Sequence, residues 1–134
     1  MAQINIQGLR ELDAALAELP NRVAKRVAGN AVRAGARVIA ADARQRVPVD
    51  TGELKRSITV RAGKRKRRGV LTALVGFLRP TSRYAHLVEF GTSHSSGKPL
   101  MRPALDGSGA QAVEKVKENL RAGIEREAAK LRRR

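Results

Sequence analysis

The two histidines, His86 and His94, and the glutamate between them, Glu89, are the first candidates for chemistry in this 134-residue chain. A catalytic zinc ion uses three ligands of these types. The spacing, however, does not follow the H-E-x-x-H pattern, and no cysteine is present to supply a thiolate ligand or nucleophile. No nucleophile-elbow motif accompanies the nearby serines, which are Ser82, Ser93, Ser95 and Ser96. The residues therefore predict no metal centre, no cofactor and no catalysis. A metal-dependent hydrolase around His86 and His94 is kept only as a third hypothesis, after the two that are given below.

The loop over residues 91–99 superficially resembles a phosphate-binding loop. That motif has four residues between its glycines, followed by Lys and then Ser or Thr. Here five residues separate Gly91 from Gly97, and Pro99 stands where the magnesium-binding hydroxyl is needed. The loop therefore does not predict a nucleotide site.

Positive charge is the strongest signal in the composition. Lys and Arg number 28 against 12 Asp and Glu, which gives a net charge of +16. Such an excess predicts a polyanionic partner: nucleic acid, a membrane surface or an acidic protein face. Because only three residues are aromatic, stacking on single-stranded bases is disfavoured, and any nucleic-acid contact should be to the backbone. Cations are concentrated at residues 132–134 and in one run, Lys64, Arg65, Lys66, Arg67 and Arg68.

Hydrophobic periodicity predicts the elements that must position these residues. Leucines spaced three and four apart from Leu9 predict an amphipathic helix that ends at Pro20, and Asn21 is a suitable N-cap for a second helix. Alternating and β-branched stretches predict strands, whereas residues 84–90 fit either a strand or a helical turn. The predicted order is strand 3–7, helix 9–19, helix 21–46, strand 57–61, strand 70–77, segment 84–90 and a charged helix 104–134.

Two turns connect these elements. Pro48 stops the second helix, and Asp50 with Glu53 has the spacing of a capping box that opens one helical turn. Glycines flank the cationic run, which predicts a protruding basic hairpin tip over residues 62–69. We therefore expect one α+β domain, residues 1–134, in which a small antiparallel sheet packs against the long helix of the N-terminal half, with a C-terminal helix beside it.

Targeting signals are not evident. The sequence has no apolar run near 18 residues and no charged segment followed by an apolar stretch at its start. We therefore expect that the protein makes no membrane contact and is synthesised in the cytoplasm of the cell that makes it.

Three motifs, in order, resemble one known family. Residues 48–58 have the form P-v-D-T-G-x-L-x-x-S-I, residues 84–92 the form Y-A-x-x-v-E-f-G-T, and residues 99–105 the form P-x-x-R-P-A-l. This succession is similar to that of the gene-product-ten-like proteins of the tailed-phage neck, which are tail-completion or minor tail components. The similarity extends from about residue 4 to residue 131.

The resemblance implies a structural virion protein of the head–tail interface: a neck ring, tail-completion protein or tail terminator. It implies a homo-oligomer that forms a hexameric ring around the DNA path. The partners it implies are neighbouring head-completion and tail proteins, with non-specific contact to the DNA backbone. The alternative is a small basic protein that is associated with the nucleoid or with RNA and binds the nucleic-acid backbone. Salt-dependent DNA affinity separates the two, since a dedicated binder starts tight and weakens steeply with salt.

The motif residues have structural interpretations. Pro48 and Gly52 would fix a turn, and Arg102 could pair with a carboxylate such as Glu89. The basic tip could face DNA or an acidic neighbouring ring, and we favour the neighbour because a tight hold on DNA would slow its passage. The residues assigned to the motifs are Pro48, Asp50, Thr51, Gly52, Leu54, Ser57, Tyr84, Glu89, Phe90, Gly91, Arg102 and Pro103.

Overall fold

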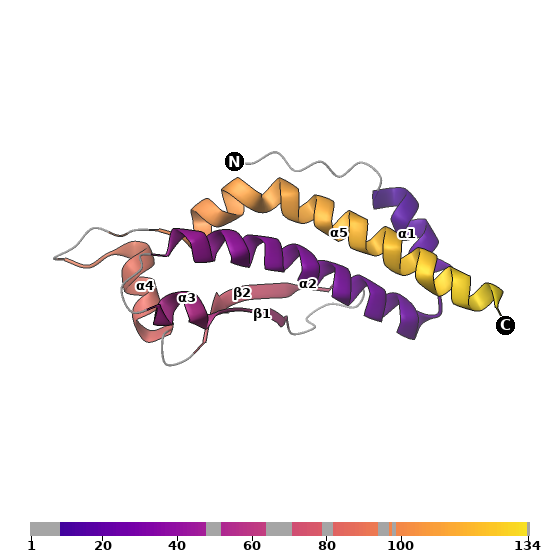
Figure 1. Cartoon of the computed structure of the whole chain (residues 1–134), viewed down its shortest axis with the longest axis horizontal. Helices are drawn as coiled ribbons and strands as arrows, with labels where there is room; N and C mark the ends of the chain where they lie inside the picture. Colours follow the sequence, from indigo (N-terminus) through magenta and orange to yellow (C-terminus); the bar gives the residue numbers. More distant parts are fainter. Residues whose placement is uncertain are drawn as a thin grey trace.

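The computed structural model of the chain describes residues 9–47, 52–63, 71–78, 82–93, 97 and 99–133, with residues 9 and 82–84 described as backbone only. The predicted strand 3–7 and the cations of the predicted tip, 64–68, lie outside these ranges. The described part is α+β, as predicted (Figure 1). Its elements are α1 Leu9–Ala17, α2 Asn21–Arg46, α3 Glu53–Ser57, β1 Ile58–Ala62, β2 Ala73–Phe77, α4 Ser82–Phe90 and α5 Met101–Arg132.

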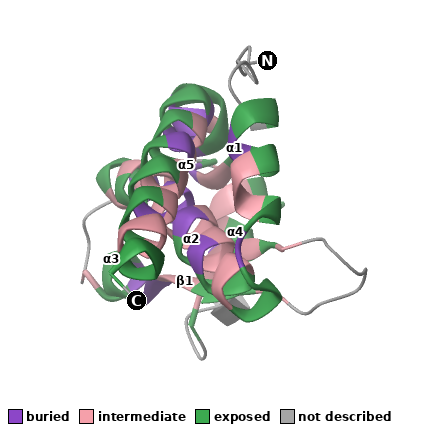
Figure 2. Ribbon diagram, turned by 90° about the vertical axis from the view of Figure 1, so that its right-hand side faces the viewer, coloured by how far each residue is buried: buried purple, intermediate pink, exposed green. Residues whose placement is uncertain are grey.

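The long helix α2 lies between α5 and the sheet (Figure 1). Small residues make the contact with α5: Ala31 is fully buried, and Gly35 lies against the backbone of Ala112 and the side chain of Val116. Nearer the C-terminus of α5, Gly123 faces Val27. Figure 2 shows the buried residues along the facing sides of α2 and α5. The Ala- and Gly-rich sequence of α2 therefore serves close helix packing.

The sheet is a two-stranded hairpin that covers the other side of α2. β1 and β2 are antiparallel, with Ile58 opposite Phe77 and Ala62 opposite Ala73. The main core cluster joins this sheet to the C-terminal half of α2, to α4 and to the start of α5. Its buried members are Ala40, Ala43, Val47, Leu54, Ile58, Ala85, Leu100 and Ala104.

Local boundaries differ from the predictions at several turns. Asn21 is the first residue of α2 and not its cap, because Pro20 takes the N-cap position and its carbonyl accepts the N–H of Ala24 at 2.9 Å. α3 begins at Glu53 after Gly52, so Glu53 is not the third helical residue that a capping box with Asp50 requires. β1 begins one residue later than predicted, because Ser57 ends α3. β2 begins at residue 73, three residues after the predicted start.

Residues 84–90, which fitted either a strand or a helical turn, belong to the helix α4. α5 begins at Met101, three residues before the predicted start at Ala104, and Pro103 lies within its first turn. Proline is tolerated in a first turn because the N–H groups there have no partner within the helix. The hydrogen-bond acceptors for the first N–H groups of α5 come from α4, and they are described with the candidate site.

Candidate assembly surface

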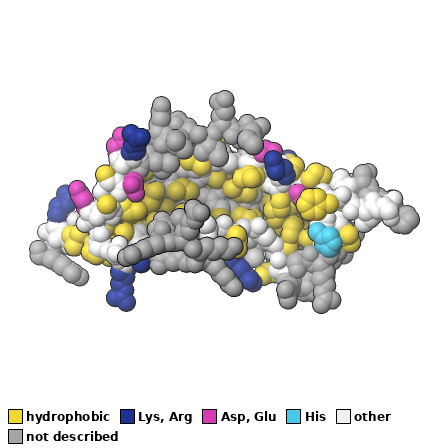
Figure 3. All heavy atoms as spheres, turned by 180° about the vertical axis from the view of Figure 1, so that it is seen from behind, with side chains coloured by type: hydrophobic (Ala, Val, Ile, Leu, Met, Phe, Trp, Pro, Cys, Tyr) yellow, Lys and Arg dark blue, Asp and Glu magenta, His cyan; other side chains and the backbone are white. Residues whose placement is uncertain are grey.

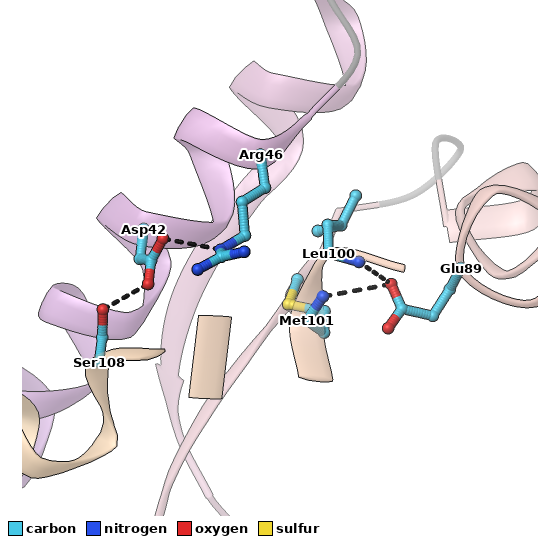
Figure 4. Close-up of polar contacts among 6 residues, drawn as sticks. All are labelled: Asp42, Arg46, Glu89, Leu100, Met101 and Ser108. Atoms are coloured by element: carbon cyan, nitrogen blue, oxygen red, sulfur yellow. Dashed lines mark hydrogen bonds and ion pairs between the residues drawn. The ribbon is translucent and has the colours of Figure 1, made fainter. Parts of the chain in front are cut away.

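Glu89, at the end of α4, caps the N-terminus of α5 (Figure 4). Its Oε2 accepts the backbone N–H groups of Leu100 at 2.7 Å and Met101 at 3.2 Å, and its Oε1 accepts the N–H of Arg102 at 3.4 Å. The first N–H groups of a helix lack internal partners, and a carboxylate beside them also favours the positive end of the helix dipole. One side chain therefore joins the second and third sequence motifs.

Arg102 does not pair with Glu89 through its guanidinium group. Its Nε lies 3.8 Å from Oδ2 of Asp106, one turn further along the same helix. Arg102 thus pairs with a carboxylate, but the partner is Asp106 and not Glu89, because the oxygens of Glu89 accept backbone N–H groups and the neighbour at i+4 is within easier reach. Both members of the observed pair are well exposed, so the pair contributes little to stability.

Glu89→Gln should lower the free energy of unfolding by about 1–2 kcal/mol, in the range of a lost N-cap with its charge. An amide offers one acceptor oxygen for three N–H groups and has no negative charge. Chemical denaturation measures the change. Glu125→Gln, an exposed change of the same type within α5, should alter stability by less than about 0.5 kcal/mol. Equal effects of the two changes would show that Glu89 is not a significant cap.

An open apolar groove of about 720 Å³ adjoins this cap. Figure 3 shows hydrophobic side chains along the middle of one face of the molecule and toward the end that carries α4. Phe90 is 82% exposed, and Leu87 and Leu105 are more than 40% exposed. The groove lies between α4, the end of β2 and the start of α5, and it is lined by Phe77, Ala85, His86, Glu89, Phe90, Pro99, Met101, Arg102 and Leu105. We call this surface the apolar groove.

Two glycines shape the chain around the groove. Gly91 has φ +82°, which lets the chain turn sharply after α4. A Cβ on Gly97 would lie 2.7–2.8 Å from backbone atoms of Glu89, Phe90 and Gly91, so the loop approaches the end of α4 too closely for a side chain. The absence of a side chain at residue 97 thus allows its backbone to lie against the end of the helix that presents Phe90.

No described residue of the first motif lines the groove. Gly52 has φ +78° and precedes α3, whose Leu54 is buried in the core cluster. The hydroxyl of Ser57, also buried, donates to the carbonyl of Leu54 at 2.8 Å. These residues turn the chain and fill the core, whereas Pro48, Asp50 and Thr51 lie outside the described residues. The backbone of Tyr84 lies in α4, and Pro103 is half-buried in α5.

A polar link that the sequence did not predict joins α2 to α5 (Figure 4). Ser108 donates its hydroxyl to Oδ2 of Asp42, and Nε of Arg46 donates to Oδ1 at 2.9 Å. The hydrogen bond from Ser108, with the bond and charge of Arg46, outweighs partial desolvation and lowers the pKa of Asp42. Asp42 is therefore ionised at neutral pH and fixes the position of α5 along α2.

The residues first considered for catalysis do not form a site in the described part of the chain. His86 is exposed on α4, while His94, Ser95 and Ser96 lie outside the described ranges. Among the described residues, no three side chains of His, Cys, Asp or Glu lie close enough together to hold a metal ion. Within the same ranges, no helix has the length and apolarity needed to cross a bilayer.

A comparison with known families gives one match. A family model described as "Bacteriophage HK97-gp10, putative tail-component" matches residues 10–91, which is more than half of the chain. The matched region includes the first sequence motif, the second motif except its last residue, all of α1 except its first residue, α2 to α4 and both strands. No curated protein and no solved structure matches at a significant level.

Proposed function

The chain belongs to the HK97-gp10-like family of bacteriophage tail components, and from this premise we propose that it is a non-catalytic protein of the head–tail interface that assembles as a ring around the DNA path. Membership of a family of tail components supports a structural role for the chain in the virion. The ring, its position in the neck and its partners are the parts that we propose.

The observation that carries this proposal is the apolar groove. Phe90 is 82% exposed in a chain of net charge +16. Exposed apolar clusters rimmed by polar groups mark sites of protein association. Phe90 of α4 and Leu105 of α5 both line the groove, so these two exposed side chains belong to one surface and are not scattered exposures.

We propose that a second copy of this chain covers the groove. In a closed ring, each subunit uses two different faces, because one face must meet a different face of its neighbour. The charges around the groove are mixed, with Glu89 and Asp106 beside Arg102 and an exposed His86. Two strongly basic subunits can approach through this region with less repulsion than through a basic face.

Light scattering measures the mass of the assembled protein after nuclease treatment and in moderate salt. We expect a discrete closed oligomer of roughly six subunits, on the cyclic-symmetry argument. A monomer at every concentration would contradict a self-assembling ring. A monomer that binds DNA tightly and loses orders of magnitude in affinity with moderate salt would instead favour the basic nucleic-acid binder. Detection of the chain in purified virions, at a few copies per particle, tests its place in the phage.

A further inference from the structure

Five arginines lie on one face of α2. They are Arg22, Arg26, Arg33, Arg37 and Arg44. Successive members are four, seven, four and seven residues apart. At about 100° per residue, these intervals place all five within an arc of roughly 60°, and at 1.5 Å per residue the row extends for about 33 Å. We call this row the arginine stripe.

The packing of α2 leaves this stripe facing outward. α5 covers the side of α2 that carries Ala31 and Gly35, and the core cluster covers Ala40 and Ala43. Arg22, Arg26 and Arg37 are exposed; Arg33 and Arg44 are half-buried. The stripe therefore borders the sheet, and Nη2 of Arg44 donates to the carbonyl of Ile58 on β1 at 2.9 Å.

The charge of the stripe is largely unbalanced. Arg26 has a carboxylate partner, Glu127, at 2.7 Å, while Arg33 donates to the amide oxygen of Asn30. No ion pair is found for Arg22 or Arg37 within the described ranges. The one acidic residue of α2, Asp42, is bound to Ser108 and Arg46. In the segments outside the described ranges, Asp50 is the one acidic side chain.

The single carboxylate that reaches the stripe is strongly engaged. Partial desolvation would raise the pKa of Glu127, but the hydrogen bond from Arg26 and the charges of Lys130 and Arg26 outweigh it and lower the pKa. One acid thus serves two cations and neutralises at most one of the five arginines. The remaining counter-charge must come from outside the chain.

A small groove of about 190 Å³ lies beside the N-terminal half of the stripe. Three cations of α2 line it, Lys25, Arg26 and Arg33, opposite Gly63 and Thr72 of the hairpin. The five cations of residues 64–68 follow Gly63 directly in the sequence. Three of the cations that line this groove, Lys25, Arg26 and Arg33, therefore come from α2.

The chemistry of the stripe favours a nucleic acid over an acidic protein. Gly29, Asn30 and Ala41, beside the arginines, are small or polar, and Val23 is half-buried. A stable protein interface has an apolar core, whereas a DNA interface is polar and strongly positive. The large exposed apolar side chains of the described residues lie on other elements. The described surface thus separates an apolar groove, suited to protein, from a basic row without an apolar centre.

We propose that the arginine stripe binds the phosphate backbone of duplex DNA without reading its sequence. The row is straight and about 33 Å long, so it can contact phosphates over roughly one helical turn of DNA. Guanidinium groups suit phosphate oxygens, and such contacts position a protein without conferring sequence specificity. This inference goes beyond the assembly proposal and does not depend on it.

The test compares two triple variants with the same net charge of +13, obtained as 16 − 3. The stripe variant is Arg22→Gln/Arg33→Gln/Arg37→Gln. The matched control is Arg10→Gln/Arg121→Gln/Arg132→Gln, three exposed arginines of α1 and α5. Glutamine keeps a high helix propensity, so both variants should fold, and thermal melting verifies this. Fluorescence anisotropy with a random-sequence 30-bp duplex measures affinity between 50 and 200 mM salt.

The wild-type protein should bind the duplex, and the stripe variant should bind at least tenfold more weakly at 50 mM salt. Loss of three phosphate contacts should flatten the plot of log affinity against log salt by about 2.7. The control should change that slope by less than about 1. Equal losses in the two variants would reduce the effect to net charge and overturn the proposal, as would the absence of DNA binding at 50 mM salt.

Poly-glutamate serves as a probe for the acidic-protein alternative. Stripe-dependent binding of poly-glutamate without binding of DNA would overturn the proposal in favour of an acidic partner. The mass of each sample is measured in parallel by light scattering. A monomer that still shows stripe-dependent DNA binding would contradict the ring and leave the stripe assignment intact, so the two failures are distinguishable.

Discussion

Phe90→Asp should give a folded protein that no longer assembles. Phe90 is 82% exposed, so removal of its aromatic side chain leaves no cavity in the core. A carboxylate in its place would have to be desolvated against the apolar surface of a second copy. Truncation of an aromatic residue at the centre of an interface commonly costs 2–4 kcal/mol, which weakens each contact by about 30- to 1,000-fold.

Light scattering should show the Phe90→Asp protein as a monomer at concentrations where the wild type is oligomeric, and the monomer should still unfold in a cooperative thermal transition. In a phage that lacks the wild-type gene, the variant should fail to support infectious particles. Leu131→Asp introduces the same charge at an exposed apolar residue near the C-terminus, at the far end from α4 (Figure 1). This control should still assemble. If Leu131→Asp abolishes assembly and Phe90→Asp does not, the subunit contact lies away from the groove.

Gly35→Ala and Gly29→Ala should have opposite effects on stability, although both change glycine to alanine inside α2. Alanine is favoured over glycine in a helix by roughly 0.5–1 kcal/mol. At Gly29 no atom lies within 4 Å of the added Cβ, so this gain should be realised. At Gly35 the Cβ would overlap Val116 Cγ2 and lie 2.9 Å from the carbonyl oxygen of Ala112. Overpacking of this kind costs about 1–3 kcal/mol.

Denaturant unfolding of the two variants measures this difference directly. The Gly35→Ala midpoint should fall below that of the wild type, and the Gly29→Ala midpoint should rise, with similar m-values. The size of the destabilisation by Gly35→Ala depends on how far α5 can move away from α2, because the contact at Ala112 is with backbone, which cannot rotate aside. Stabilisation by both substitutions would show that α2 and α5 are not held at the distance described.

Much of this architecture was predictable because strong local signals coincide with it. α2 matches the predicted residues 21–46, since its hydrophobic period is long and prolines stand at both ends. The hairpin was predicted from β-branched alternation, and its β1 and β2 strands are short but correctly placed to within three residues. The family resemblance, which rests on the motifs, agrees with the match over residues 10–91.

The parts that were missed depend on residues far apart in the sequence. The start of α5 is fixed by Glu89, eleven residues before the first N–H group that it accepts, and no pattern within residues 99–105 reveals this. The bond between Ser108 and Asp42 joins residues 66 positions apart. The apolar groove likewise arises only when α4, β2 and α5 meet. The arginine stripe was present in the sequence as a period of four and seven, but it becomes a surface only once α5 is known to cover the opposite side of α2.

Polar contacts attach α5 at three points, and this has a consequence for how copies of the protein would act together. Glu89 holds its first turn, Asp42 a point further along, and Arg26 its last turns. The groove and the arginine stripe therefore belong to a stiff unit, and the orientation of one determines the orientation of the other. In a cyclic assembly held at the groove, every stripe would present the same angle to the axis. Individually weak contacts would then add through avidity, while each could exchange rapidly as DNA moves past.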